Sequence, residues 1–136
     1  MTKEVSQHTP TIFEQIRQVD EQGNEFWSAR TMAKALEYSE YRHFQPVIER
    51  AKEACVNSGQ KLTDHFEDIL EMVPIGSGAE RKIDSVRLSR YACYLIVQNA
   101  DPSKEIVALG QTYFAIQTRL HEIRQMEEYN LSLIHI

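Results

Sequence analysis

The segment RYACYLIVQN, residues 90–99, limits the possible folds of this chain more than any other. Its apolar residues surround almost the whole helix axis, and a helix with that pattern is buried on all sides. Ser89 stands just before it and can accept a hydrogen bond from a free N–H group of the first turn. We therefore expect residues 90–99 to form the central helix of the core, with the other elements packed around it.

Length and composition predict one domain. A chain of 136 residues can bury enough surface for a single core, and 42% hydrophobic with 26% charged residues is typical of soluble globular proteins. No apolar run approaches the roughly 20 residues of a membrane-spanning helix, and the first residues lack the apolar region of a secretory signal. We expect a cytoplasmic protein with no membrane contact: a disordered N-terminus over residues 1–9, one domain over residues 10–126, and a truncated or aberrant tail over residues 127–136.

The N-terminal part of the domain is predicted to contain a short helix and a short strand. A helix over residues 10–19 would start with a proline, and Thr11 and Glu14 have the spacing of a capping box. Residues 21–24 have the composition of a turn. The aromatic segment that follows, residues 25–27, is expected to be extended.

Two further helices are predicted to meet at a short corner. Ser28 can cap a helix that ends near Glu37, and Ser39 can cap the next one, whose apolar residues stay on one face over residues 41–55. Pro46 falls inside this second helix and removes one backbone donor. We expect either a kink there or a helix that restarts with Pro46 in its first turn.

After this helix pair the pattern predicts a β-hairpin. Residues 65–75 and 81–88 flank the tip sequence IGSGAE, and the second segment alternates apolar and polar residues. The start of the first segment, DHFEDILEM, is also compatible with a helical turn. The glycines around Ser77 are expected to form a flexible hairpin tip.

The last predicted element is a long helix that Asp101 and Pro102 open. Its apolar residues follow heptad spacing at Ile106, Leu109, Tyr113, Ile116, Leu120 and Ile123, a set we call the seam. The seam requires a partner helix, either in the same chain or in a second copy that would make a homodimer. The seam covers fewer than three full heptads, which favours packing within the chain.

No catalytic, metal or cofactor site is recognisable. HEIRQ, residues 121–125, resembles a zinc-binding HExxH motif but has glutamine in place of the second histidine. Cys55 and Cys93 are isolated within apolar patterns, as buried structural thiols are. The adjacent acidic residues diverge on a helix or strand and do not form an acid/base pair. We expect a protein that is not an enzyme and needs no cofactor.

The order of elements is that of a winged helix-turn-helix protein: a helix pair with a short corner, followed by a two-stranded ribbon. We therefore predict a mostly helical α+β fold with a helix-turn-helix or winged-helix-like core, a β-hairpin, a buried helix and a long C-terminal helix. The net charge of −5 repels DNA, so DNA contact requires a local basic patch. The candidate nucleic-acid-binding residues are Arg30, Lys34, Arg42, His43, Ser77, Arg81 and Lys82.

Two long blocks carry a resemblance to a known family. FWSARTMAKALEYSEYRHFQPVIERAKEAC and IGSGAERKIDSVRLSRYACYLIVQNADPSKEIVALGQTYFAIQTR resemble the bacterial DNA-damage-inducible protein D family, whose N-terminal region is similar to the Bro-N domain of viral and prophage antirepressors. The resemblance spans residues 11–125. Where the family usually has glycine, this chain has Glu37, which would cost about 1 kcal/mol if the corner needs a left-handed residue.

The resemblance implies a non-enzymatic protein of the bacterial DNA-damage response that binds DNA or acts as an antirepressor-like regulator. It also implies an alternative, in which the protein modulates a recombinase filament on single-stranded DNA without contacting DNA itself. The acidic surface and the seam favour the second interpretation, and the predicted basic patch favours the first.

Overall fold

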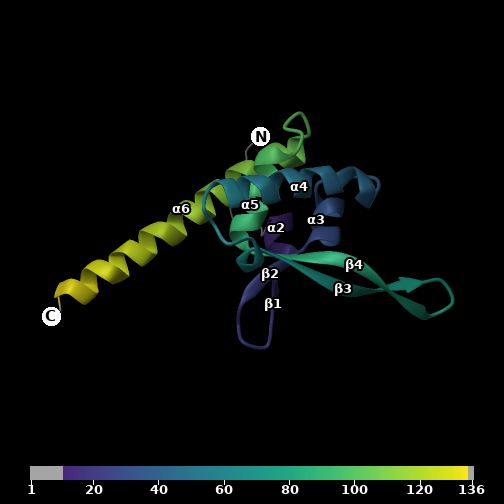
Figure 1. Cartoon of the computed structure of the whole chain (residues 1–136), viewed down its shortest axis with the longest axis horizontal. Helices are drawn as coiled ribbons and strands as arrows, with labels where there is room; N and C mark the ends of the chain where they lie inside the picture. The colour runs from purple at the N-terminus through teal and green to yellow at the C-terminus, as the bar shows by residue number, and fades with distance from the viewer. Residues whose placement is uncertain (1–10, 135–136) are drawn as a thin grey trace, which may run out of the picture.

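The computed structural model describes residues 11–134 and shows helices packed against an antiparallel sheet (Figure 1). In chain order the elements are α2 (Ile12–Gln15), β1 (Gln18–Val19), β2 (Glu25–Ser28), α3 (Ala29–Ala35), α4 (Tyr41–Asn57), η1 (Leu62–Asp64), β3 (Phe66–Ile75), β4 (Ala79–Leu88), α5 (Arg90–Asn99) and α6 (Glu105–Ile134). The four strands lie in the order β1-β2-β4-β3, which confirms the α+β class. The predicted disordered segment, residues 1–9, lies outside the described residues, as do the last two residues of the predicted tail.

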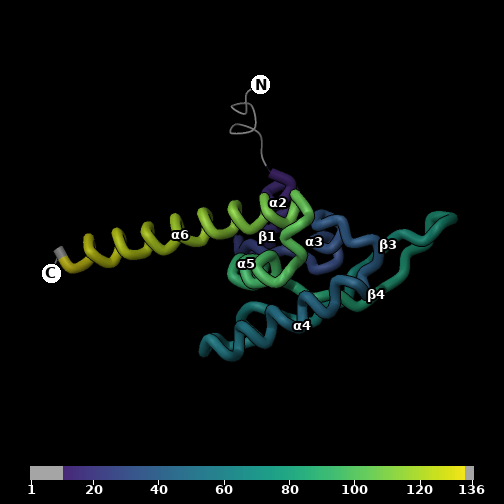
Figure 2. The backbone as a smooth tube through the Cα atoms, turned by 90° about the horizontal axis from the view of Figure 1, so that it is seen from above, coloured from purple at the N-terminus to yellow at the C-terminus, as the bar shows by residue number. Residues whose placement is uncertain are grey.

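The hydrophobic core is built around α5, as the sequence predicts. Ala92, Cys93, Ile96 and Val97 of this helix are fully buried. Ser89 caps α5 by accepting a hydrogen bond from the N–H group of Ala92 at 3.0 Å. α4 and α6 pack on opposite sides of α5 (Figure 2), so its nearly continuous apolar surface is covered.

The predicted first helix, residues 10–19, is wrong beyond its first turn. α2 covers only Ile12–Gln15, and Gln18–Val19 form β1 instead. The capping interaction is present at the predicted place, since Thr11 Oγ1 accepts a hydrogen bond from the N–H group of Glu14 at 3.2 Å. The capping spacing of Thr11 and Glu14 therefore marks the start of α2, but the predicted helix was too long.

A tight turn after β1 explains why the helix stops. The carboxylate of Asp20 accepts hydrogen bonds from the N–H groups of Gln22 and Asn24, both at 2.9 Å. Gly23 supplies the left-handed residue of this turn with a φ of 86°. The turn returns the chain so that β2 pairs with β1, and that pairing replaces the last turn of the predicted helix.

Of the two serines predicted to cap the helix pair, only Ser28 does so. Ser28 caps α3 as predicted, because its Oγ accepts a hydrogen bond from the N–H group of Thr31 at 3.3 Å. The predicted cap at Ser39 is wrong. Glu40 is the N-cap residue of α4 and makes no capping hydrogen bond, because its carboxylate instead accepts one from Nε of Arg42 at 2.6 Å.

α4 runs without interruption from Tyr41 to Asn57, so the predicted restart at Pro46 is wrong. A proline inside a helix costs about 3 kcal/mol. Phe44, Val47 and Ile48 are buried on the face of α4 that meets the core. Each buried apolar side chain of this size contributes about 1.5–3 kcal/mol, which outweighs the one missing backbone hydrogen bond.

The predicted hairpin is confirmed as β3 and β4. The helical alternative for its start holds only at Asp64, the last residue of η1, because the strand begins at Phe66. A left-handed Ser77 at φ 56° and Gly78 at φ 80° form its tip. Near its base the hairpin joins the sheet, where Leu88 pairs with Trp27 of β2. Residues 70–84, which we call the arm, extend away from the body of the molecule (Figures 1 and 2).

α6 starts later than predicted. Asp101 and Pro102 belong to a turn, in which Oδ1 of Asp101 accepts a hydrogen bond from the N–H group of Ser103 at 3.0 Å. The helix itself begins at Glu105, and the carbonyl oxygen of Lys104 accepts its first backbone hydrogen bonds. The polar turn thus takes the place of the predicted helical first turn.

The first half of α6 packs within the chain through Val107, Gly110 and Phe114, which are buried. A Cβ atom on Gly110 would lie 2.8 Å from Cζ of Phe13, so only glycine permits this close approach. Most of the seam lies on another face of the helix. The exposed seam residues are Leu109, Ile116, Leu120 and Ile123, with exposed fractions of 56%, 52%, 49% and 39%.

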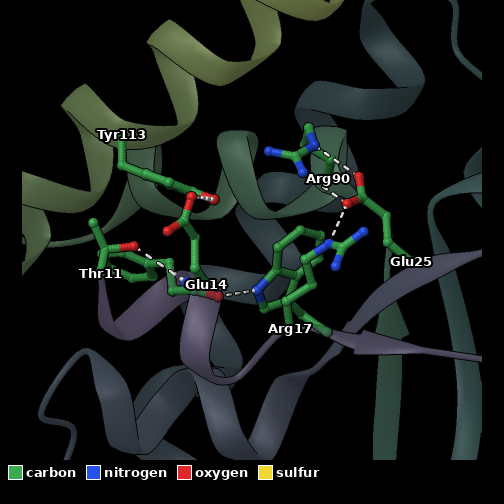
Figure 3. A network of polar contacts seen from close by, with 8 residues as sticks. Thr11, Glu14, Arg17, Glu25, Arg90 and Tyr113 are labelled. Atoms are coloured by element: carbon green, nitrogen blue, oxygen red, sulfur yellow. Dashed lines mark hydrogen bonds and ion pairs between the residues drawn. The ribbon is translucent and has the colours of Figure 1, made fainter. Parts of the chain in front are cut away.

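A polar network around Glu25 connects the N-terminal segment to α5 (Figure 3). Nε of Arg17 donates to Oε1 of Glu25 at 2.6 Å, and Arg90 donates from Nε and Nη2 to both carboxylate oxygens at 2.7 Å. Burial raises the pKa of Glu25, but the hydrogen bonds from Arg90 and Arg17 outweigh it and leave the pKa below its usual value. Tyr113 of α6 approaches Glu14 of α2 at 3.5 Å in the same region.

The cysteines behave as predicted structural thiols: both are free and buried, and burial raises the pKa of each. Within residues 11–134, no group of three or more His, Cys, Asp or Glu side chains is placed to hold a metal ion. In the same part of the chain, no helix is both long enough and apolar enough to cross a membrane.

Candidate nucleic-acid interface

Three aromatic rings hold the corner between α3 and α4. Phe44 is fully buried, and its ring centroid lies 5.0 Å from that of Tyr38 and 6.4 Å from that of Tyr41. Aromatic pairs at these distances add to the hydrophobic contribution of each ring. Arg42 and His43 lie beside this cluster and are exposed. The aromatics are therefore scaffold, and the cations face outward, as the sequence predicts.

The corner itself requires a left-handed residue, and Glu37 fills that position with a φ of 65°. The N–H group of Tyr38 donates to the carbonyl of Ala33 at 2.9 Å, and that of Glu37 donates to the carbonyl of Lys34 at 3.0 Å. This pair of hydrogen bonds is the Schellman motif, which normally has glycine at the left-handed position. The same motif ends α4, where Gly59 has a φ of 88°.

Replacing Glu37 with glycine is expected to raise the free energy of unfolding by about 0.5–1 kcal/mol, because a left-handed backbone is strained for glutamate. The converse change, Gly59→Ala, should lower it by about the same amount or more. Urea unfolding followed by circular dichroism measures both values. A Glu37→Gly variant that is less stable than the parent would contradict the idea of a strained corner.

Arg30 connects the corner to the hairpin. Its Nε donates to the carbonyl oxygen of Asp84 on β4 at 2.6 Å, and its guanidinium lies 4.0 Å above the ring of Tyr41. Burial raises the pKa of the Tyr41 hydroxyl, which therefore stays neutral under the guanidinium. Arg30 is half-buried and engaged on both sides, so its role is to fix the arm relative to the corner.

The other candidate cations of the helix pair, Lys34, Arg42 and His43, are exposed. The side chain of Arg42 is 70% exposed and forms an ion pair with Glu40 at 2.6 Å, which lowers the pKa of Glu40. Exposed pairs of this kind contribute little to stability and exchange readily with other partners. Lys34 and His43 are exposed and make no ion pair within residues 11–134.

The two cations of the arm lie on opposite faces of the ribbon. Arg81 pairs with Val73 across the strands and Lys82 pairs with Met72. Because successive residues of a strand point to opposite faces, Arg81 and Lys82 cannot contribute to one flat basic strip. Both side chains are exposed.

A concave surface joins the corner to one face of the arm. The residues that line a cavity of about 330 Å³ include Arg30 and Lys34 of α3, Tyr38 and Tyr41, and Glu71, Val73 and Ile83 of the arm. Glu71 is the carboxylate among them and accepts a hydrogen bond from Ser28 at 2.7 Å. Arg81 shares this face of the arm, since it lies opposite Val73. The structure thus brings Arg30, Lys34 and Arg81 to one side and places Lys82 on the other. Ser77 lies at the tip, where its hydroxyl donates to the carbonyl of Gly76 at 2.6 Å.

No sequence pattern indicates a role for Arg17 and Arg90, the cations around Glu25. Arg17 and Arg90 are far apart in the chain and meet only because β2 and the start of α5 are neighbours. No local spacing relates them, and neither stands in a charge run. Only knowledge of the strand and helix packing reveals this cluster.

The chain is similar to a known protein family and to one characterised relative. Residues 15–115 match the model of the BRO family, N-terminal domain. The chain is 58% identical over 122 residues to the DNA damage-inducible protein D of Escherichia coli (strain K12), an alignment that covers 90% of this chain and 44% of that relative. The chain therefore spans less than half the length of that relative. No solved structure matches the chain. The first two findings confirm the resemblance seen in the sequence.

Proposed function

Because this chain belongs to the family of the BRO N-terminal domain, which its residues 15–115 match, we propose that it is a non-enzymatic regulator of the DNA-damage response that binds DNA. The name of its relative, DNA damage-inducible protein D, supports the place in that response. Family membership and the exposed cations support DNA as the ligand and an antirepressor-like mode of regulation.

The arm is the observation that carries this proposal. Arg81 and Lys82 are exposed on its opposite faces and make no ion pair among the described residues. A two-stranded ribbon can enter a DNA groove, and both walls of a groove carry phosphates. A cation on each face of the ribbon can then reach each wall, so the separation of the two side chains favours groove insertion over contact with a flat surface.

The helix pair adds to this arrangement in the manner of a winged helix-turn-helix protein. Lys34, Arg42 and His43 surround the corner, and Arg30 fixes the arm beside it. In our proposal the corner cations contact phosphates and the arm is the wing. The net charge of −5 limits DNA contact to local groups of cations, because the field of the whole molecule repels DNA.

The double variant Arg81→Ala/Lys82→Ala tests the proposal. We expect weaker binding to duplex DNA and a salt dependence that is shallower by about 1 for each lost phosphate contact. Fluorescence anisotropy across a salt series measures both quantities. The thermal midpoint should stay nearly unchanged, because both side chains are exposed.

A matched control removes two positive charges elsewhere. Lys61 and Arg119 are exposed and belong to neither the arm nor the corner. The variant Lys61→Ala/Arg119→Ala changes the net charge equally and should retain most of the binding and the salt slope. If the parent does not bind duplex DNA, or if both double variants lose the same affinity, the arm is not the contact.

A second function is favoured by the exposed seam residues of α6. Leu109, Ile116, Leu120 and Ile123 form an uncovered apolar stripe, and such stripes are common sites of protein contact. In this alternative the protein docks a recombinase filament on single-stranded DNA, or pairs with a second copy, and does not touch DNA. Binding to bare and recombinase-coated DNA across the same salt series separates the two functions, since only the alternative requires the coated strand.

A further inference from the structure

Three arginines from separate parts of the chain line one cavity of about 400 Å³. Arg17 precedes β1, Arg90 is the first residue of α5, and Arg124 lies on α6. The turn residue Asn24 and the α6 residue Gln117 also line it. Such convergence on a molecule of net charge −5 concentrates positive potential at one concave place.

The charges in this cavity do not balance. Glu25 is the one carboxylate among the lining residues, and it accepts hydrogen bonds from both Arg17 and Arg90 at 2.6–2.7 Å. Arg124 makes no ion pair within residues 11–134. Two guanidinium groups therefore share the carboxylate of Glu25, while Arg124 lines the cavity without a counter-charge, and the cavity holds a positive excess that a bound anion would neutralise.

Glu25 also orders the site before any ligand arrives. Because its two oxygens engage Arg17 through Nε and Arg90 through Nε and Nη2, both guanidinium groups are held in place. The side chains of Arg17 and Arg90 are 41% and 21% exposed, so they are partly withdrawn from solvent. Ligand binding then costs little side-chain ordering at these two positions.

The ligand class follows from the donors. A guanidinium presents planar pairs of N–H groups that match the oxygens of phosphate or carboxylate. A terminal phosphate group offers three oxygens and close to two negative charges, which suits several guanidinium groups better than a carboxylate does. The amides of Asn24 and Gln117 can supply further hydrogen bonds.

We propose that this cavity binds a terminal phosphate group, carried either by a free nucleotide or by a phosphorylated nucleic-acid end. Arg17 and Arg90 form the fixed part of the site, and Arg124 closes it from α6. This proposal does not rest on DNA binding by the arm, because the cavity is lined by other residues and can be tested with inorganic phosphate.

The test compares Arg124→Gln with Arg119→Gln. Arg124 is exposed and unpaired within the described chain, so its loss should leave the fold intact. Arg119 lies on the same helix, pairs with Glu122 at 3.5 Å and does not line the cavity, which makes it a matched control. Inorganic phosphate should raise the thermal midpoint of the parent in a saturable way, against chloride at equal ionic strength. Arg124→Gln should weaken this binding roughly tenfold, and Arg119→Gln should not.

The same variants identify the source of the phosphate. If the ligand is a nucleic-acid end, an oligonucleotide with a 5′-phosphate should bind more tightly than the same oligonucleotide with a 5′-hydroxyl. If the ligand is a free nucleotide, a mononucleotide should compete with phosphate as well as the phosphorylated oligonucleotide does. Either result, lost in Arg124→Gln, supports the site. No saturable effect of phosphate, or equal losses in both variants, would overturn it. The arm variant Arg81→Ala/Lys82→Ala should keep phosphate binding, so failure of one proposal leaves the other intact.

Discussion

Replacing Phe114 with alanine is expected to lower the free energy of unfolding by about 3–5 kcal/mol, the range for a buried phenylalanine. Phe114 is fully buried where α6 crosses the body, and its ring lies 5.3 Å from Phe13 and 5.6 Å from Trp27. Removing it leaves a cavity among rigid rings that cannot close in. Urea unfolding followed by circular dichroism measures the loss.

The control for this prediction is Ile116→Ala on the same helix. Ile116 is 52% exposed, so its truncation removes little buried surface and should change the free energy of unfolding by less than about 0.5 kcal/mol. Alanine favours the helix at both positions, so helix propensity cannot cause a loss in either variant. If both variants lose the same stability, the loss does not come from the packing of Phe114 against Phe13 and Trp27.

The variant Glu25→Gln is expected to lower the free energy of unfolding by about 1.5–3 kcal/mol, the range for charge-assisted hydrogen bonds. The Glu25 and Arg90 side chains are 26% and 21% exposed, so the pair is only partly hydrated. Glutamine has a similar shape but leaves Arg17 and Arg90 facing each other without a negative charge between them. Unfolding in urea at neutral pH gives the difference.

Acidification should reduce this difference. The pKa of Glu25 lies below its usual value of 4.5 in the folded protein, so the unfolded chain binds the proton more readily than the folded one. The contribution of Glu25 is therefore complete above about pH 4.5 and is lost as the pH falls through the folded pKa. The parent should lose stability over that range, and the Glu25→Gln variant should lose less.

Glu122→Gln is the matched control for both measurements. Glu122 pairs with Arg119 at 3.5 Å, but these side chains are 60% and 71% exposed. Exposed pairs of this kind contribute little, so this variant should keep the stability and the acid profile of the parent. Equal effects at residues 25 and 122 would show that net charge, not the local network, sets the acid response.

Local chemistry predicted much of the fold. Ser28 and Ser89 cap their helices as expected because an N-cap depends on residues one turn away. The hairpin was found because glycine at its tip and alternation along its strands are both short-range signals. α5 was identified as the core helix from its composition, since few other environments accept so apolar a segment.

Two of the failures share one physical cause, which is competition from partners that sequence patterns do not contain. Gln18 and Val19 left the predicted helix because β2 offered a strand partner. The seam on α6 had the regular spacing, yet Gly110 and Phe114 determine its packing because Phe13 fits against the small residue. Helical periodicity cannot distinguish two neighbouring apolar faces until the partner surface is known.

The candidate site also has a part that local sequence predicts and a part that depends on tertiary packing. The aromatic residues beside Arg42 predicted that its side chain is exposed. The resemblance to the family, which usually has glycine at residue 37, indicated that this corner can require a left-handed backbone. Arg81 and Lys82 were grouped because they are adjacent, but adjacency on a strand means opposite faces. The arginine cavity was invisible because residues 17, 90 and 124 are related only through the tertiary fold.

The length of α6 has a consequence for how this molecule moves in solution. Its 30 residues make a rod about 45 Å long, and the arm points the other way (Figure 1). A compact globule of 136 residues would have a radius of gyration of about 14 Å. Viscous drag on such an elongated particle exceeds that on a sphere of 15.8 kDa, so a single copy should elute from a sizing column earlier than its mass implies and can be mistaken for a larger species. Light scattering, which reads mass independently of shape, distinguishes the two.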